Sequence, residues 1–330
     1  MHRRTTARFA LALGLVVTAP LLAASSSWAA PPVPSRAAPA TTAVRAPAAT
    51  AATTTTTARP RTIYISLSHD IVTMPTTVRA GTYYVQVRTT DAANGVTVVR
   101  PPSTLTPSTF YARFRAISSA TGSGVAAAIH RYRTSATFVG GTRAEAGHVG
   151  AFAIRLSPGR YFFFSAAGSD PLGEDLGRGV RRYDPGRVKV VTVVGPAPAA
   201  LPVATVGVAR LGIDWARSTS VSLPTALPRR GFLLTVGGRG LTSDLWVRRI
   251  LPGVTDPELH DGTCLAGGLQ PPRDCFDAVS AQIGGAVSPG ASAWFYYDLP
   301  PGDYAVGSGD HNDNFDWFFI MGLVQRVHVS

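Results

Sequence analysis

Two stretches of the chain repeat the same series of landmarks, and this duplication limits the folds open to it. The segment Met74-Pro-Thr-Thr-Val-Arg-Ala-Gly81 reappears as Leu223-Pro-Thr-Ala-Leu-Pro-Arg-Arg-Gly231, displaced by 149 residues. Phe152-Ala-Ile-Arg-Leu-Ser-Pro-Gly-Arg-Tyr161 reappears as Phe295-Tyr-Tyr-Asp-Leu-Pro-Pro-Gly-Asp-Tyr304, displaced by 143. Each series ends in a valine-rich stretch. The shared order and spacing predict two copies of one structural unit.

Alternating apolar residues predict strands in both copies. Apolar residues take every second position at 63–67 and 83–87 and, in the second copy, at Phe232, Leu234 and Val236. A period of two is typical of a strand with one buried face, so we expect these residues to face a core.

Helical patterns are scarce by comparison. The best helix start is Thr255-Asp-Pro-Glu258, a capping box with proline in the first turn, and it supports one or two turns only. The chain is therefore predicted to be all-β.

The first 61 residues are predicted to stay outside the fold. Residues 1–29 have the pattern of a secretory signal peptide, with arginines, a short apolar run and small residues at a cleavage site. The apolar run is shorter than the ~20 residues of a bilayer span, so no membrane span is expected in the mature chain. Residues 30–61 are almost entirely Ala, Pro and Thr, which is typical of a disordered linker. We expect a secreted protein.

The remaining chain divides at a second linker. Residues 195–202 are rich in Pro and Ala and carry no charge, so we place a domain boundary there, between a first sandwich at 62–194 and a second at 203–330.

Composition excludes some classes of protein. Charged residues make up 15% of the chain and hydrophobic ones 45%, which rules out a wholly disordered protein. Six of the formal +12 charges are arginines before residue 61, where no acid occurs, so the folding part carries +6. With few charges and an export signal, no nucleic-acid partner is expected. The basic segment 177–187, which includes Arg187, suits an anionic surface such as a cell-wall polymer.

The repeated Leu-x-Pro-Gly-x-Tyr segments point to a particular kind of β-sandwich. In Greek-key sandwiches a tyrosine near the start of a late strand hydrogen-bonds back to the turn before it, and Tyr161 and Tyr304 are placed to do so. The C-terminal copy, with Gly302-Asp-Tyr304, a loop, Met321-Gly322 and a closing strand, resembles the plastocyanin-type cupredoxins. The resemblance implies two tandem Greek-key cupredoxin-like sandwiches.

The same resemblance implies where copper ligands would stand, and the sequence lacks them. Blue-copper members hold the metal with a thiolate and two imidazoles. Counting from Tyr304 places Ser308 at the thiolate position, and Asp244 stands about where an earlier histidine is expected. His311 keeps the usual spacing. A hydroxyl does not replace a thiolate, so we expect degenerate sandwiches without blue copper.

The two cysteines and one polar loop carry the remaining site predictions. Cys264 and Cys275 are expected to form a disulfide because the chain is exported. The alternative, Cys264 as a nucleophile beside His260, requires both thiols to stay reduced. In the loop at 308–321, oxygen ligands and one imidazole suggest a Cu or Ca site, the alternative being a solvated loop. Its candidate ligands are His311, Asp310, Asn312 and Asn314.

Three functions remain open at this point. The first is a non-catalytic extracellular binding or surface protein whose partner is a cell-wall polymer or a surface protein, with Asp244, Trp246 and Trp317 as ligand-binding residues in loops at the strand ends. The second is metal binding by the 308–321 loop. The third is a cell-wall polysaccharide hydrolase, although no catalytic motif is present, so the chain leans towards a non-enzyme. Its carboxylates would be among Asp256, Glu258, Asp310, Asp313 and Asp316.

Aromatic residues near the second copy's last strands allow two interpretations. They form either a binding platform or a part of the core. The residues concerned are Trp294, Tyr296, Tyr297, Trp317, Phe318 and Phe319.

Overall fold

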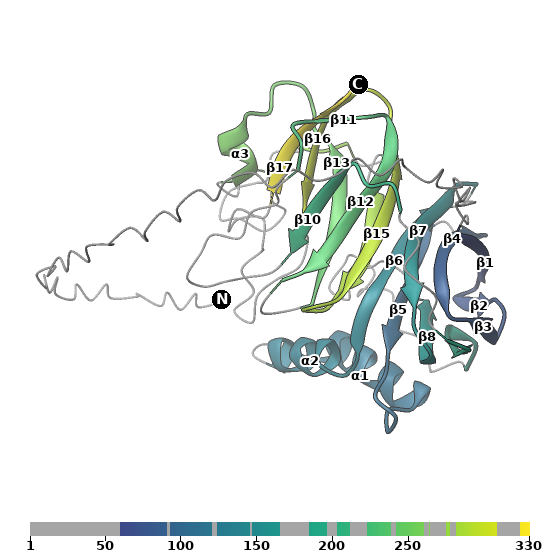
Figure 1. Cartoon of the computed structure of the whole chain (residues 1–330). Helices are drawn as coiled ribbons and strands as arrows, with labels where there is room; N and C mark the ends of the chain where they lie inside the picture. The colour runs from purple at the N-terminus through teal and green to yellow at the C-terminus, as the bar shows by residue number, and fades with distance from the viewer. Residues whose placement is uncertain are drawn as a thin grey trace, which may run out of the picture. The chain divides into compact units, whose positions relative to one another are not determined.

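The fold is described from a computed structural model, shown in Figure 1. The structure describes residues 60–90, 93–120, 124–145, 147–165, 185–196, 203–211, 223–238, 242–260, 264, 275–277, 282–308 and 324–330. Their strands form two sheets of seven and ten strands. The signal peptide lies outside these residues, as does nearly all of both predicted linkers.

The first copy contributes strands to both sheets. Those in the seven-stranded sheet are β1 (Arg61–Ser68), β2 (Ile71–Thr73), β4 (Gly81–Thr89) and β7 (Val149–Leu156). Those in the ten-stranded sheet are β3 (Thr77–Arg79), β5 (Ala93–Arg100), β6 (Thr137–Glu145), β8 (Gly159–Ser165) and β9 (Val188–Val194). A short 3-10 turn, η2 (Pro185–Arg187), precedes β9.

The second copy is divided between the same two sheets. Its strands in the seven-stranded sheet are β10 (Gly207–Leu211), β12 (Arg230–Gly237) and β15 (Ser292–Asp298). Its strands in the ten-stranded sheet are β11 (Ala226–Leu227), β13 (Ser243–Arg249), β14 (Gln282–Val287), β16 (Gly302–Gly307) and β17 (Val324–Val329).

The strand order confirms the duplication. The series β7-β4-β1 is matched by β15-β12-β10, and β6-β5-β8-β9-β3 by β14-β13-β16-β17-β11. The parallel pairs also match, since β1 with β4 corresponds to β10 with β12, and β3 with β9 to β11 with β17. Two Greek-key cupredoxin-like sandwiches in tandem are therefore present. Each has its own apolar core, one around Val85 and Phe152 and the other around Leu233 and Phe295.

The two copies share their sheets. Strand β7 pairs antiparallel with β15, with Ala153 opposite Trp294, and β6 pairs antiparallel with β14, with Thr142 opposite Gly284 (Figure 1). Both sheets therefore continue from one copy into the other. The boundary predicted at 195–202 remains a prediction, because most of it lies outside the described residues.

Glycines make this close approach of the copies possible. A Cβ atom on Gly285 would lie 2.4 Å from the Cα atom of Gly141 and 2.5 Å from the carbonyl carbon of Gly140. Real Cβ atoms do not approach backbone this closely, so a side chain at Gly285 would push β6 and β14 apart.

We expect Gly285→Ala to lower the free energy of unfolding by about 1 to 3 kcal/mol, because overpacking forces the backbone to shift. Urea denaturation of the variant measures it. The matched control is Gly124→Ala, at the start of a helix, where the nearest atom to an added Cβ is 4.0 Å away. If both substitutions have the same effect, the contact across the junction is looser than described.

Two helices in the first copy were not predicted. Helix α1 (Pro107–Ser119) begins after Thr106, whose side chain accepts a hydrogen bond from the backbone N–H of Thr109, and α2 (Gly124–Arg133) follows it. Both pack their apolar faces, which include Phe110 and Tyr132, on one side of the ten-stranded sheet. The signal was present in the Thr-Pro start and the i, i+3, i+4 apolar spacing, but the surrounding Ser, Thr and Arg residues masked it.

The face assigned to one strand was wrong. In β12 the residues Leu233 and Thr235 are buried, whereas Phe232, Leu234 and Val236 face the other way and are only partly buried. Alternation alone does not say which set faces the core when both sets contain apolar residues. The outer face of this sheet is therefore more apolar than a solvated sheet face usually is.

Candidate functional site

The two positions that the family resemblance assigns to copper ligands in the second copy lie together and are buried. Ser308 directly follows β16 and is fully buried, and Asp244 stands in the neighbouring strand β13 with an exposed fraction of 6%. The Ser308 hydroxyl donates a hydrogen bond to Oδ1 of Asp244 over 3.4 Å. The two residues that the family resemblance singled out are therefore in contact.

The first copy contains the same kind of pair. Ser165, the last residue of β8, donates through its hydroxyl to Oδ1 of Asn94 in β5, over 3.0 Å, and both residues are buried. The sequence analysis missed this pair. Its signal was the spacing, since Ser165 follows Tyr161 by four residues as Ser308 follows Tyr304.

A buried polar network extends from the first pair. The side-chain amide of Asn94 donates to Oδ1 of Asp70 over 2.9 Å, and Asp70 forms an ion pair with Arg187. Arg187 also donates to the hydroxyl of Tyr111 on α1 over 3.3 Å. The Arg187 side chain is only 8% exposed, so Arg187 itself does not reach an anionic surface, while the surface predicted for the 177–187 segment as a whole stays a prediction. The other residues of the 177–184 segment lie outside the described residues.

The donor atoms in these two pairs do not fit blue copper. They are hydroxyl, amide and carboxylate oxygens, whereas the blue-copper centre needs a soft thiolate and two imidazoles. Within the described ranges, no three His, Cys, Asp or Glu residues are grouped so as to hold a metal. The proposed metal ligands Asp310, His311, Asn312 and Asn314 lie outside these ranges, so metal binding there stays a prediction.

The predicted ligand-binding residues that can be placed have packing partners. Trp246 is 7% exposed, and its ring lies 5.6 Å from that of Phe276, with the guanidinium of Arg248 over its face. Asp244 is buried against Ser308. Trp317 lies outside the described residues, and ligand binding by this set stays a prediction.

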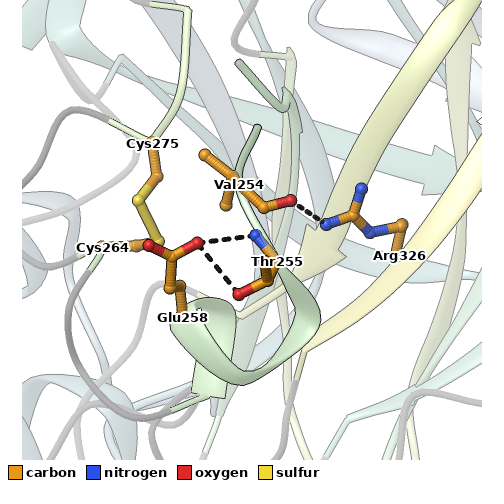
Figure 2. The surroundings of a disulfide bond; sticks show 6 residues. All are labelled: Val254, Thr255, Glu258, Cys264, Cys275 and Arg326. Atoms are coloured by element: carbon orange, nitrogen blue, oxygen red, sulfur yellow. Dashed lines mark hydrogen bonds between the residues drawn. A yellow bond between two sulfur atoms is a disulfide. The ribbon is translucent and has the colours of Figure 1, made fainter. Parts of the chain in front are cut away.

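The acidic group around 256–260 has structural contacts. In Figure 2 the Glu258 carboxylate accepts from the backbone N–H of Thr255 over 2.7 Å and from its hydroxyl over 2.9 Å. The first of these bonds is one of the two that define the predicted capping box, and the helix α3 (Asp256–His260) is one turn long. Asp256 pairs with Nε of Arg326 over 2.5 Å. The hydrolase hypothesis therefore loses Asp256 and Glu258 as an acid–base pair, and its other carboxylates lie outside the described residues.

A cleft of about 460 Å³ lies in the second copy, next to Val254 and Arg326. Its lining includes Arg326 and Asp303, and Asp303 pairs with Arg326 over 3.6 Å and with His328 over 2.8 Å.

The predicted disulfide is present. Cys264 and Cys275 are bonded and lie beside Val254 (Figure 2), and both are buried in a cluster that also contains Leu259. Neither cysteine is therefore available as a nucleophile.

We expect reduction of this disulfide, or the double change Cys264→Ala with Cys275→Ala, to lower the free energy of unfolding by about 2 to 3 kcal/mol, because the unfolded chain regains the entropy of a short loop. Denaturation with and without reductant measures the difference. An unchanged midpoint would mean that the bond does not restrain the unfolded state.

Both predicted tyrosine corners form. The Tyr161 hydroxyl accepts from the backbone N–H of Ser157 over 3.2 Å, and the Tyr304 hydroxyl donates to the carbonyl of Pro300 over 2.9 Å. Each tyrosine thus fixes the turn four residues before it, and burial raises the pKa of Tyr304.

Tyr297 has a buried hydroxyl with no hydrogen-bond partner among the described residues. Burial raises its pKa to about 12. The unfolded tyrosine loses its hydroxyl proton near pH 10, whereas the folded state keeps it. The free energy of unfolding is therefore unaffected by this group below pH 10 and falls as the pH rises from 10 towards 12.

We expect Tyr297→Phe to raise the free energy of unfolding at neutral pH by about 1 kcal/mol, because an unpaired hydroxyl is removed, and to weaken the loss of stability at alkaline pH. Denaturation at neutral and alkaline pH tests both effects.

The predicted aromatic group divides between the core and the surface of the sheet. Tyr297 is fully buried in the core, as that interpretation predicted, whereas Trp294 and Tyr296 lie on the opposite face of β15 and are partly exposed. Trp317, Phe318 and Phe319 lie outside the described residues.

Comparison with known proteins gives structural matches alone. No protein-family model matches the chain, and no curated protein is similar to it. Among solved structures, the blue copper protein auracyanin A from Chloroflexus aurantiacus matches at 14% identity over 41% of this chain and 100% of its own, with a TM-score of 0.27. Auracyanin from Roseiflexus castenholzii matches at 18% identity over 42% of this chain and 100% of its own, with a TM-score of 0.26.

A further match extends over most of the chain. The copper-containing nitrite reductase of Thermus scotoductus matches at 15% identity over 82% of this chain and 61% of its own, with a TM-score of 0.22. TM-scores this low carry no conclusion about function, and the fold assignment rests on the strand order. Among the described residues, no helix is both long and apolar enough to cross a membrane.

Proposed function

We propose that this protein is a non-catalytic extracellular binding protein built on two cupredoxin-like sandwiches. The observation that carries the proposal is the pair of buried hydrogen bonds, Ser308 with Asp244 and Ser165 with Asn94, at the positions where the family resemblance would place copper ligands. The extracellular setting follows from the signal-peptide pattern at 1–29, and the disulfide is in keeping with it.

The two pairs favour a scaffold over an electron carrier. A hydroxyl and a carboxylate or amide have no accessible redox state, and they satisfy each other's hydrogen-bonding capacity within a buried site. The Ser165 pair is further connected to Asp70, and through it to Arg187. Such a network stabilises the end of a sandwich.

Copper titration of the mature chain, residues 30–330, tests the proposal. We expect no intense thiolate-to-copper absorption and no reversible one-electron couple. The assay control is the double variant Ser308→Cys with Asp244→His, which supplies a thiolate and an imidazole at the positions that the family resemblance assigns to copper ligands. Intense blue absorption with a reversible couple in the unaltered chain would contradict the proposal and indicate an electron-transfer protein.

The binding part of the proposal has its own test. We expect the mature chain to sediment with insoluble cell-wall material. If it stays in solution with every wall preparation, the binding role is wrong even where the copper result agrees.

A further inference from the structure

The outer face of the seven-stranded sheet is unusually apolar. This face consists of the residues that alternate with the core-facing ones in each strand. Of the four most exposed large apolar side chains in the described part of the chain, three lie on it: Tyr64 at 66%, Val149 at 47% and Ile71 at 40%. Their concentration on one face, and not their number, makes this face a candidate interaction surface.

One row of this face crosses both copies without a break. The strand registers place six residues side by side, and with a strand spacing of about 4.8 Å the row is about 24 Å long. In order the residues are Thr62, Tyr84, Ala153, Trp294, Leu234 and Val208. An extended row of this kind suits a linear ligand lying across the strands better than a compact one.

Aromatic rings join the two copies on this face. The ring of Tyr84 lies 5.7 Å from that of Phe232 and 6.2 Å from that of Tyr296, while Phe232 and Tyr296 are 5.3 Å apart. Tyr84 comes from the first copy and the other two from the second. Ala151 and Ala153, the β7 residues between the two copies on this face, are only 4% and 1% exposed, so the ligand would contact the rings around them and not β7 itself.

The charges on this face are mainly positive. Exposed arginines stand at outward positions in three strands, Arg88 in β4, Arg155 in β7 and Arg230 in β12. Among the described outward-facing strand residues the one acid is Asp298, and its Oδ1 lies 3.7 Å from Nε of Arg229. Two copies of this face packed together would bring arginines near one another, which disfavours self-association.

We propose that the outer face of the seven-stranded sheet binds an anionic polysaccharide, a chain of sugar rings that carries carboxylate or phosphate groups. The apolar C–H faces of the sugars would pack on Tyr64, Trp294 and Tyr296, because aromatic side chains combine apolar area with a polar edge. Sugar hydroxyls would bond with Gln86 and Thr62, and the anionic groups would pair with the arginines. This inference rests on the proposed binding function and names its ligand class and surface.

The test measures binding of the mature chain to polygalacturonate, which carries carboxylates, and to a polyglycerol-phosphate teichoic acid, with neutral dextran as control. We expect micromolar or tighter binding to at least one anionic polymer, weakened by salt, and none to dextran. Trp294→Ala is expected to weaken binding about tenfold. Arg88→Gln with Arg230→Gln should weaken it and flatten its salt dependence.

The matched pair Val149→Ser and Val194→Ser locates the surface. Both valines are exposed strand residues, at 47% and 42%, but Val149 lies on the outer face and Val194 lies on β9 of the other sheet. Val149→Ser should weaken binding and Val194→Ser should not. Because both side chains are exposed, neither substitution threatens the fold.

Several outcomes would overturn the inference. They are failure to bind either anionic polymer, tighter binding to single-stranded DNA than to both, equal effects of the two valine changes, or a dimer that Tyr64→Ser converts to a monomer. If the chain sediments with wall material while face variants bind normally, the proposed function stands and only this surface is wrong. If copper titration shows a reversible blue centre, the proposed function itself fails.

Discussion

Arg187→Met is expected to lower the free energy of unfolding by about 3 to 5 kcal/mol. The substitution leaves the carboxylate of Asp70, which is 18% exposed, without its ion-pair partner, and it removes the hydrogen bond to Tyr111. Breaking one side of a largely buried ion pair costs this much because the remaining charge stays poorly solvated. Urea denaturation monitored by tryptophan fluorescence measures it.

The control for this prediction is Arg229→Met. Arg229 pairs with Asp298 over 3.7 Å, but its side chain is 70% exposed, so we expect a change of about 0.5 kcal/mol or less. Equal losses in the two variants would show that the Asp70–Arg187 network contributes no more than a surface ion pair.

Phe110→Ala is expected to cost about 3 to 5 kcal/mol, the usual range for removing a buried phenylalanine. Phe110 is fully buried, and its ring lies 5.4 Å from Tyr132 on α2, 5.9 Å from Phe162 on β8 and 6.3 Å from Phe138 on β6. Its removal opens a cavity where both helices meet the ten-stranded sheet.

Arg115→Ala on the exposed side of the same helix is the control, with an expected change within about 0.5 kcal/mol. Thermal and urea denaturation of both variants separate core packing from helix propensity. If Phe110→Ala is as mild as its control, the helices do not share the core.

The fold was largely predictable because turn residues and local spacing carry it. The repeated Pro-Gly-x-Tyr segments predicted β8 and β16, and the hydrogen bonds of Tyr161 and Tyr304 explain why this motif recurs. The disulfide and the capping box at Thr255 were also predicted from local signals.

Features that depend on distant residues were missed. The pairing of β7 with β15 and of β6 with β14 joins segments about 140 residues apart, and no local pattern encodes it. The burial of Arg187 depends on Asp70, which is distant in sequence. The two sides of β12 are both rich in apolar residues, so alternation did not identify the buried one.

The candidate site consists of two buried pairs, and the sequence analysis named the residues of only one of them. The family resemblance assigned Ser308 and Asp244 to copper-ligand positions, and these two side chains are hydrogen-bonded to each other. The equivalent Ser165 and Asn94 were missed, although Ser165 follows Tyr161 at the same spacing as Ser308 follows Tyr304. The outer apolar face emerged only when the strand registers placed Tyr84 and Trp294 in one row.

A crystal structure of the mature chain grown with excess Cu²⁺, with anomalous data collected at the copper absorption edge, tests the central claim most directly. The predicted result is direct contact between Ser308 and Asp244 and between Ser165 and Asn94, with no anomalous peak at either pair. A strong peak coordinated at either pair would contradict the account and return the protein to the copper-binding cupredoxins.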